Sequence, residues 1–570
     1  MYHMAYPMAR KVSIPVLLAA AALAFHLFAG LSFIRSAAAT YDETVHLASG
    51  FSYLHTGRYV MNIMDHPPLS EMLSALPVLA LKPQAFTAHP YFANFMPYHY
   101  GDLFLYQNTV SPERLLNTAR VFTFLLWTAL AAWLIWLFAS RLESRAAGAF
   151  SLCAFAFMPV FISNDAIIST DAAAALFYFA AFALGWLFTA EAPAGKKGEK
   201  GGRLRLWAAL AGAASGLALV SKFSMFVVPP LVAAFWIADN YFWPRLKFSK
   251  LLGYILLYAA ACLLVVALVY KFNLGLYWDG LHATLKRLDT GRSSFALGQY
   301  ALNGVWWYFP AALAVKTPLL VLAGAAAGTW LAFKNFRKDY LWLLLPPAFF
   351  FAVALTAKVQ IGYRHIMPVM PFLAVLAGLA LARLYEWKRG AWLAAALLAL
   401  NAASVARAHP HYLAYFNEFA GGPAGGYKLF VDSNLDWGQS VKQAAEYLKG
   451  RGNPPVIFSY FGVARPESYG VNYVPLGVVS NVELKGTGAQ VCGMTEVLLA
   501  VSATNLQGTY YPDKQTFGWL KGRKPAFIAG YSIFIYDLTR DGEGLEKLAA
   551  IFDREGRNAE ADCLYGLAGK

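Results

Sequence analysis

Long runs of apolar residues, separated by short polar or basic connections, constrain the fold of this chain more than any other feature of its sequence. Most of the runs reach or approach the roughly 20 residues that an α-helix needs to cross about 30 Å of hydrocarbon. We expect eleven membrane-spanning helices, at about residues 12–34, 115–140, 146–162, 171–190, 206–221, 223–240, 251–272, 308–333, 341–357, 365–383 and 391–406. The pattern therefore predicts a polytopic α-helical membrane protein.

Composition supports this class of protein. Of the 570 residues, 58% are hydrophobic and only 14% are charged, whereas about a quarter of the residues in a soluble protein are charged. The net charge of +15 does not indicate a nucleic-acid partner, because the basic residues form short clusters between apolar runs. The first run is too long for a signal peptide and lacks a small-residue cleavage site, so we interpret it as a retained span.

The basic clusters predict the orientation of the chain in the membrane. They lie at 10–11, 141–145, 196–205, 245–250, 334–338 and 383–389, in every second connection. The positive-inside rule assigns these connections, and with them the N-terminus, to the cytoplasm. The first outer loop 35–114, the outer loop 273–307 and residues 407–570 then lie outside. We expect a bacterial inner (plasma) membrane, with the C-terminal domain in the periplasm or outside the cell.

The chain divides near residue 406 into a transmembrane domain, 1–406, and a C-terminal domain, 407–570, whose sequence is typical of a soluble α/β fold. The segments PVIFSYFGV, TEVLLAVSA and PAFIAGYSIFIYDL predict strands, the last with a hairpin turn, and WGQSVKQAAEYLKGRG predicts a helix. Cys492 and Cys563 lie in this domain, where a disulfide can persist. The sequence does not decide whether these two cysteines are joined. A disulfide between them would stabilise the domain by roughly 4 kcal/mol.

Acids and imidazoles follow the first span directly. The stretch ATYDETVHLASGFSYLHTGRYVMNIMDHPPL, residues 39–69, contains the neighbouring acids Asp42 and Glu43 and, further along, His46, Asp65 and His66. One interpretation is that Asp42 caps a surface helix. The other is functional, because a charge kept beside lipid costs free energy and usually marks a site. Asp171, in SNDAIISTDAAAALF, is either a helix cap or a second acid of the same outer cavity.

Cations accompany these acids on the predicted outer side. Lys222 interrupts LALVSKFSMFVV, Arg364 and His365 precede the tenth span, and Arg292 lies in the loop 273–307. Each side chain either reaches toward lipid headgroups or contributes to a cavity that binds an anion. At a membrane surface the common anion is a lipid phosphate. The histidines lack a metal-ligand spacing such as HExxH, so we predict neither a metal site nor a required cofactor.

Several motifs occur in order over about residues 35–380: YDETVHLASGFSYLHTGRY, MDHPPL, STDAAAALFYFA, SKFS, GVWWYFPAALAVKTPL and GYRHIMPVMPFLAVLAG. Together they resemble GT-C glycosyltransferases that use a polyprenyl-phosphate sugar, in particular the protein O-mannosyltransferase and lipid A aminoarabinose transferase groups. The resemblance implies three catalytic acids: Asp42 as the base, Glu43 as its adjacent partner, and Asp171 in the second acidic motif. It also implies that Lys222 and Arg364 bind the carrier phosphate. Many relatives have a histidine where this chain has Asn164-Asp165, which leaves Asp165 without a role.

The resemblance and the charged residues together predict an inverting glycosyltransferase. It would move a single sugar from a polyprenyl (undecaprenyl) phosphate carrier to a hydroxyl or phosphate of a protein, lipid or glycan acceptor. We add Arg292 and His365 to the phosphate-binding residues, and we assign to the substrate cavity His46, Tyr59, Asp65, His66 and Tyr363. Two alternatives remain, a ligase or polymerase of lipid-linked glycans and, with less support, a transporter. The segment YLAYFNEFAGGPAGGYKLFVDSNLDWGQSVKQ resembles a subgroup of bacterial and archaeal members and receives no catalytic role.

Overall fold

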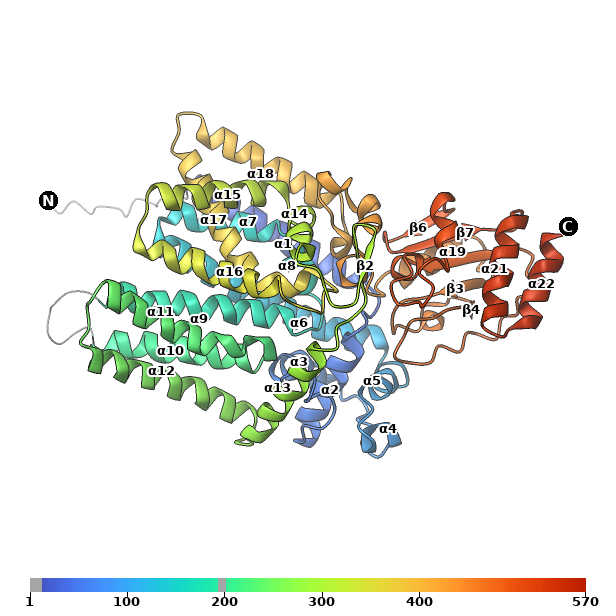
Figure 1. Ribbon diagram of the computed structural model, residues 1–570, viewed down its shortest axis with the longest axis horizontal. Helices are drawn as coiled ribbons and strands as arrows, with labels where there is room; N and C mark the ends of the chain where they lie inside the picture. The colour runs from blue at the N-terminus through green and yellow to red at the C-terminus, as the bar shows by residue number, and fades with distance from the viewer. Residues whose placement is uncertain (1–12, 193–200, 570) are drawn as a thin grey trace, which may run out of the picture.

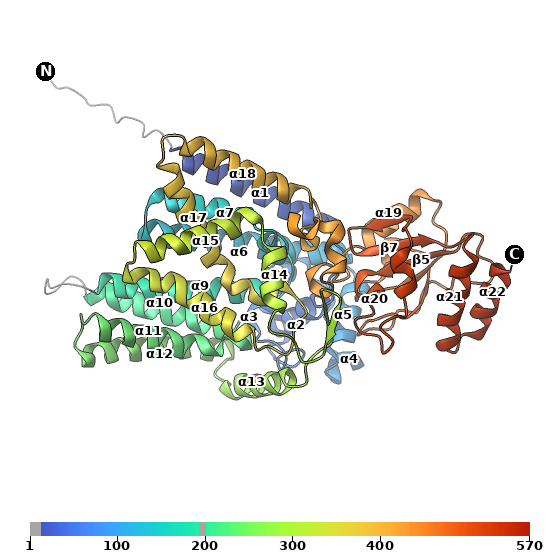
Figure 2. The ribbon, with the colours of Figure 1, turned by 45° about the horizontal axis from the view of Figure 1, so that its top comes forward.

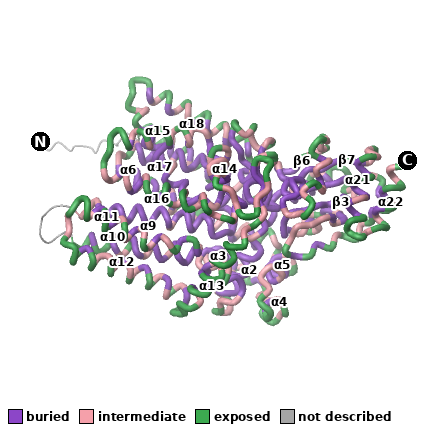
Figure 3. The backbone as a smooth tube through the Cα atoms, in the orientation of Figure 1, coloured by how far each residue is buried: buried purple, intermediate pink, exposed green. Residues whose placement is uncertain are grey.

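The computed structural model describes residues 13–192 and 201–569. A bundle of long helices forms one end of the molecule and a β-sheet domain forms the other (Figure 1). Shorter helices and a two-stranded hairpin, one strand of which is labelled β2, lie near the junction of the two (Figures 1 and 2). Buried residues continue from the bundle through this junction into the sheet domain (Figure 3), and they form one continuous apolar core.

Each predicted apolar run is helical in the structure, although several runs are divided between two helices. Here η denotes a 3₁₀-helix. The elements of the bundle are α1 (Ile14–Ser36), α6 (Pro112–Leu142), α7 (Arg145–Ala156), α8 (Pro159–Asn164), α9 (Asp171–Glu191), α10 (Gly201–Leu219), η2 (Phe223–Val227), α11 (Val228–Phe242), α12 (Phe248–Val269), α14 (Tyr308–Lys316), α15 (Leu319–Lys334), η3 (Lys338–Tyr340), α16 (Leu341–Ala354), η4 (Tyr363–Val369), α17 (Met370–Tyr385) and α18 (Gly390–Ala406).

Length and apolar composition define a smaller set of membrane spans than the sequence predicts. Six helices in the described residues are long and apolar enough to cross a membrane: Ile14–Ser36, Pro112–Leu142, Asp171–Glu191, Phe223–Phe242, Phe248–Val269 and Tyr363–Tyr385. The pair α14 and α15, bent by 113°, makes a seventh if it is one span. The protein is therefore a multi-helical membrane protein, while the count of eleven spans stays a prediction.

Small residues allow the helices of the bundle to approach closely, as is common where helices meet in a membrane. A Cβ atom at Gly212 of α10 would lie 2.2 Å from the carbonyl oxygen of Tyr258 in α12. A Cβ atom at Gly328 of α15 would lie 2.1 Å from the carbonyl oxygen of Leu376 in α17. These glycines are required for the packing of the two helix pairs.

Basic connections between the helices meet at one end of the bundle. Arg337 and Arg383 both pair with Glu143, each at 2.5 Å, which joins the connection after α15 and the end of α17 to the connection after α6. Lys338 pairs with Asp239 of α11 at 3.2 Å. Which side of the membrane this end of the bundle faces stays a prediction. Of the basic clusters, 10–11 and Lys196, Lys197 and Lys200 lie outside the described residues.

The two predicted outer loops fold into short elements at the opposite end of the bundle. The first contains α2 (Glu43–Thr56), α3 (Leu69–Ala75), η1 (Leu76–Leu81), α4 (Pro90–Ala93) and α5 (Pro97–Tyr106). The second contains α13 (Leu274–Leu288) and the antiparallel strands β1 (Ser294–Ala296) and β2 (Gln299–Ala301). Both loops lie at the end of the bundle nearer the sheet domain, with α13 and α4 at its lower edge (Figure 2).

The C-terminal region is a mixed α/β domain. Its five-stranded sheet has the order β4-β3-β5-β7-β6, with parallel pairs among β4, β3 and β5 and antiparallel pairs among β5, β7 and β6. The strands are β3 (Val456–Ser459), β4 (Tyr473–Pro475), β5 (Leu498–Ser502), β6 (Phe527–Ala529) and β7 (Ile533–Asp537). The helices are η5 (Tyr412–Ala414), η6 (Glu418–Ala420), η7 (Pro423–Lys428), η8 (Asp432–Asn434), α19 (Val441–Gly450), η9 (Pro466–Tyr469), α20 (Ala503–Leu506), η10 (Gly518–Gly522), α21 (Gly542–Arg554) and α22 (Asn558–Ala568).

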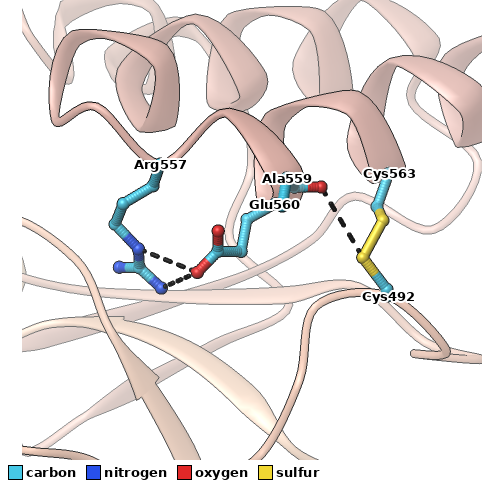
Figure 4. Close-up of a disulfide and its surroundings, with 5 residues drawn as sticks. All are labelled: Cys492, Arg557, Ala559, Glu560 and Cys563. Atoms are coloured by element: carbon cyan, nitrogen blue, oxygen red, sulfur yellow. Dashed lines mark hydrogen bonds and ion pairs between the residues drawn. A yellow bond between two sulfur atoms is a disulfide. The ribbon is translucent and has the colours of Figure 1, made fainter.

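The predicted strands, the β6–β7 hairpin and the helix over 441–450 are confirmed. A disulfide joins Cys492, in the loop before β5, to Cys563 of α22, with their Cα atoms 5.3 Å apart. Figure 4 shows the bridge beside the ion pair of Arg557 with Glu560. The bridge therefore ties α22 to the loop that leads into β5.

Candidate active site

Four charged side chains from distant parts of the sequence meet where the bundle joins the outer loops. The Nη1 atom of Arg364 lies 2.7 Å from Oδ2 of Asp171, and its Nη2 atom lies 3.6 Å from Oδ2 of Asp42. The Nζ atom of Lys222 lies 2.5 Å from Oδ1 of Asp171. Arg364 thus links the two acids that the sequence singled out. We call Asp42, Asp171, Lys222 and Arg364 the charge cluster.

Local structure explains how each of these side chains reaches the cluster. Asp171 is the first residue of α9, where the helix dipole favours a negative charge. Lys222 has extended backbone angles between α10 and η2. Arg364 lies in η4, a 3₁₀ turn that contains Pro368 and leads into α17. Asp42 directly precedes α2. All four residues therefore occupy the ends of helices, where the chain is free to turn a side chain inward.

Exposure separates the members of the charge cluster into two kinds. The side chains of Asp42 and Lys222 are 25% and 22% exposed, whereas those of Asp171 and Arg364 are 1% and 9% exposed. Both carboxylate oxygens of Asp171 are occupied by cations. Asp42 is the acid of the cluster that an external molecule can reach.

Glu43 lies beside Asp42 in sequence but points into the protein. Its carboxylate accepts hydrogen bonds from Nε and Nη2 of Arg120 at 2.8 and 2.5 Å, and from the backbone N–H groups of Thr40 and Ile168 at 2.8 and 3.0 Å. Burial acts to raise the pKa of Glu43, but Arg120 and the two N–H groups outweigh burial and hold that pKa below its ordinary value. Glu43 thus connects the loop that carries Asp42 to α6 and to the residues before α9.

A second buried group joins His46 of α2 to Glu71 of α3. His46 Nδ1 is 2.8 Å from Oε1 of Glu71, which also accepts a hydrogen bond from Asn62 at 2.7 Å. Burial lowers the pKa of His46, but the hydrogen bond to Glu71 and its charge outweigh burial and raise that pKa. The ring of His66 packs edge-on against that of His46, 4.9 Å between centroids, and burial together with the His46 charge lowers the pKa of His66 well below its ordinary value. His46 and His66, both predicted as cavity residues, therefore lie together.

The other residues that we assigned to the substrate cavity have partners outside the charge cluster. Asp65 pairs with Arg287 of α13. The Tyr59 hydroxyl donates a hydrogen bond to the carbonyl of Val269, at the end of α12, at 2.7 Å. Tyr363 is buried, and its hydroxyl lies 2.5 Å from that of Thr317. These residues connect the outer loops to the helices around the cluster.

Two residues predicted to bind phosphate have weaker links to the charge cluster. The Nε atom of Arg292 donates a hydrogen bond to the Tyr510 hydroxyl at 3.1 Å, and its guanidinium group lies 5.2 Å from the centre of that ring. His365 is half-buried, with its ring centroid 6.4 Å from that of Phe309. Within residues 13–192 and 201–569, no group of at least three His, Cys, Asp or Glu residues is arranged to hold a metal ion.

Sequence reasoning missed two contacts of Arg364 that come from the C-terminal region. Its Nε atom donates a hydrogen bond to the Ser433 hydroxyl at 3.0 Å, and its guanidinium group lies 4.1 Å from the centre of the Trp437 ring. Glu71 and Arg120 were also missed. The cluster of aromatic and small polar residues in FVDSNLDWGQS, within the domain predicted to be external, was the available signal for Ser433 and Trp437.

These features define a multi-helical membrane protein with a cluster of acids and cations at the ends of its helices. Residues 38–274 match the model of the family described as dolichyl-phosphate-mannose-protein mannosyltransferase. The matched segment is less than half of the chain, and over it the chain is similar to these glycosyltransferases. The matched segment contains Asp42, Asp171 and Lys222 but ends before Arg364.

Solved structures of similar fold include ArnT from Cupriavidus metallidurans bound to undecaprenyl phosphate, with 14% identity, 92% of this chain and 98% of that chain covered, and a TM-score of 0.46. The apo structure of the same protein has 13% identity, coverage of 92% and 97%, and a TM-score of 0.47. Archaeal AglB from Archaeoglobus fulgidus, in complex with an inhibitory peptide and a dolichol-phosphate, has 12% identity, coverage of 76% and 58%, and a TM-score of 0.48. At these identities the similarity says nothing of the site. A comparison with curated proteins finds no match.

Proposed function

We propose that this protein transfers a single sugar from a polyprenyl phosphate, undecaprenyl phosphate in a bacterial membrane, to a hydroxyl or phosphate group of an acceptor. The observation that carries the proposal is the position of Arg364, which pairs with the buried Asp171 and the partly exposed Asp42 at once. A group that binds the departing phosphate and a group that accepts a proton from the acceptor are thus adjacent. The reaction requires both groups at one place.

Asp42 is the catalytic base of the proposed reaction. It removes the proton of the acceptor hydroxyl while the acceptor oxygen attacks the anomeric carbon and the bond from that carbon to the phosphate oxygen breaks. Direct displacement inverts the anomeric centre. The leaving phosphate is already a weak base, so no general acid is needed. A positioned base of this kind contributes a rate factor of about 10²–10⁴.

Charge balance within the cluster supports these roles. Asp42 and Asp171 are neutralised by Lys222 and Arg364, so the cluster has no net formal charge before the reaction. When Asp42 takes up the acceptor proton, the cluster gains one positive charge as the departing phosphate gains one negative charge. Cations that are already in place stabilise this developing charge without reorganisation. Asp171 then acts as the counter-ion that positions both cations.

The location of the site fits a lipid-linked donor. α9 begins at Asp171 and α17 follows Arg364, and both helices run from the charge cluster to the basic end of the bundle. There Arg245 donates a hydrogen bond to the Thr189 carbonyl of α9, and Arg383 of α17 pairs with Glu143. By the positive-inside rule the basic end is cytoplasmic. We therefore propose that the charge cluster and the C-terminal domain face the periplasm. A donor whose sugar and phosphate reach the cluster can then keep its hydrocarbon tail in the bilayer.

A transfer assay on the purified protein in detergent tests this function. It uses radiolabelled undecaprenyl-phosphate monosaccharides with a crude extract of outer-face acceptors, and it measures the release of free undecaprenyl phosphate. We expect release by the wild type and a loss of about 10²-fold or more with Asp42→Asn. Asp279→Asn, at an exposed acid of α13, is the matched control.

Equal rates for the wild type and Asp42→Asn would remove Asp42 as the base. Failure of the wild type to turn over any single-sugar donor, while still binding undecaprenyl phosphate, would favour a ligase or polymerase of whole lipid-linked glycans.

A further inference from the structure

Residues 432–439 of the C-terminal region, with the sequence DSNLDWGQ, connect the sheet domain to the charge cluster. The segment begins with η8 and leads into α19. It is buried throughout: Trp437 is 2% exposed and Asn434 is fully buried. A solvent-facing linker between a membrane domain and a soluble domain would not be expected to bury so many polar side chains. We call residues 432–439 the wedge.

One set of contacts holds the guanidinium group of Arg364. Trp437 lies against its face at 4.1 Å, and the Ser433 hydroxyl accepts a hydrogen bond from Nε at 3.0 Å while donating one to the carbonyl of Ile361 at 2.8 Å. The salt bridge to Asp171 uses the Nη1 atom of the same group. The guanidinium group is therefore held on one face and two of its edges before any substrate binds.

A second set of contacts holds the chain that leads to Asp42. The backbone N–H of Tyr41 donates to the carbonyl of Trp437 at 3.0 Å, and that of Ala38 donates to the carbonyl of Gln439 at 2.8 Å. The Gln439 side chain fixes the turn from within, because it accepts from the N–H of Trp437 at 2.7 Å and donates to the carbonyl of Leu435 at 2.8 Å. The backbone of Trp437 thus orients the proposed base while its side chain orients the proposed phosphate-binding cation.

The wedge is itself anchored on both sides. Toward the bundle, the Asn434 side chain accepts from the N–H of Tyr363 at 2.8 Å and donates to the hydroxyl of Tyr308 at 2.9 Å. Toward the sheet domain, Asp436 accepts from the N–H of Thr504 in α20 at 2.8 Å. Asp432 has a φ of 57°, which is uncommon for a residue other than glycine and persists where surrounding contacts hold it.

We propose that the wedge is part of the catalytic apparatus, with Trp437 and Ser433 as positioning residues that hold Arg364 at a fixed separation from Asp42. This inference rests on the proposed function, in which Arg364 stabilises the departing phosphate. The C-terminal domain would then be required for the chemical step itself, and not only for recognising an acceptor.

The test compares Trp437→Ala and Trp437→Phe with the wild-type full-length protein. Trp519→Ala is the matched control, because Trp519 also stacks on an arginine of the same domain, Arg523, at 5.2 Å. We expect Trp437→Ala to lower kcat/KM for the undecaprenyl-phosphate donor about 10- to 30-fold, with most of the loss in kcat. Trp437→Phe keeps an aromatic face and restores most of the rate, and the Trp519→Ala control matches the wild type.

A second measurement does not depend on turnover. Phenylglyoxal modifies accessible arginines, and peptide mass spectrometry gives the rate at each position. If Trp437 covers Arg364, Trp437→Ala increases the modification rate of Arg364 several-fold and leaves that of Arg114, an exposed residue of α6, unchanged.

The outcomes separate the two proposals. If the wild type turns over the donor and Trp437→Ala has the same kcat, the proposed role of the wedge is wrong and the proposed function stands. A wild type without turnover overturns the proposed function, and the modification rate of Arg364 then decides whether the wedge positions it. Equal modification rates in Trp437→Ala and the wild type refute the inference.

Discussion

The buried pair of Glu43 and Arg120 provides a direct test of whether the acid next to Asp42 acts in chemistry or in folding. Its side chains are fully buried and 1% exposed, so water cannot replace a lost partner. Glu43→Gln removes the negative charge and leaves a buried guanidinium whose remaining acceptors are all neutral, namely the new side-chain amide oxygen and the carbonyls of Ile34, Ala37 and Ala38. Breaking one side of a buried pair costs about 3–5 kcal/mol. We expect Glu43→Gln and Arg120→Met each to destabilise the protein by about this amount.

The double variant distinguishes the pair from two independent residues. Removal of both charges leaves no uncompensated ion, so the combined cost should fall below the sum of the single costs by 2 kcal/mol or more (about half of one single cost). Equilibrium unfolding in mixed micelles with rising SDS content, followed by tryptophan fluorescence, measures these free energies. Arg114→Met, at an exposed arginine of the same helix, is the control.

Two results would refute the reasoning on Glu43. Additive costs in the double variant would mean that the pair is not coupled. A Glu43→Gln protein of wild-type stability, with its activity abolished, would return Glu43 to the catalytic residues.

Three further predictions follow from the structure. Lys222→Met, which removes the more exposed cation of the charge cluster, should weaken binding of undecaprenyl phosphate about 10-fold in a binding titration; unchanged affinity would contradict its role. Burial raises the pKa of Asp436 to about 7, so this acid binds its proton more tightly in the folded state, and stability should fall as the pH rises from about 4 to 7. Asp436→Asn should flatten this part of the curve of Tm against pH. An unaltered curve would show that Asp436 is not the source of the pH dependence. The double variant Cys492→Ser with Cys563→Ser should lower the unfolding free energy of the sheet domain by roughly 4 kcal/mol, measured by denaturant unfolding. A loss below about 1 kcal/mol would show that the disulfide contributes little to the stability of this domain.

Much of the local structure could be predicted from sequence because its causes are local. Apolar runs of helical length predicted the helical segments of the bundle apart from the short η3, and the Gly-Tyr dipeptide at 530–531 predicted the turn between β6 and β7. The bends within these segments were not predicted. α14 and α15 meet at 113° where Thr317-Pro318 interrupts the run, and a hydropathy pattern does not distinguish such a break from a continuous span.

The candidate site could be predicted in part. Asp42, Asp171, Lys222 and Arg364 were chosen by motif and by their position at the ends of apolar runs, and they do meet in the structure. The motif placed Glu43 with Asp42 among the catalytic acids, because it does not show that neighbouring residues face opposite directions. Only the position of Arg120, 77 residues away from Glu43, shows that Glu43 points into the protein.

The sequence by itself determined the class of the protein, most of its helices, its mixed α/β C-terminal region and the residues that carry its charges, since these depend on composition and on neighbours within a few residues. The tertiary structure alone decided which charges are paired. Arg364 acquires its partners from α9, from the loop before α2 and from the wedge, and the contacts with the wedge cross 69 residues or more. Such contacts depend on the packing of whole helices and domains, and no local pattern in the chain encodes the partner of a buried charge.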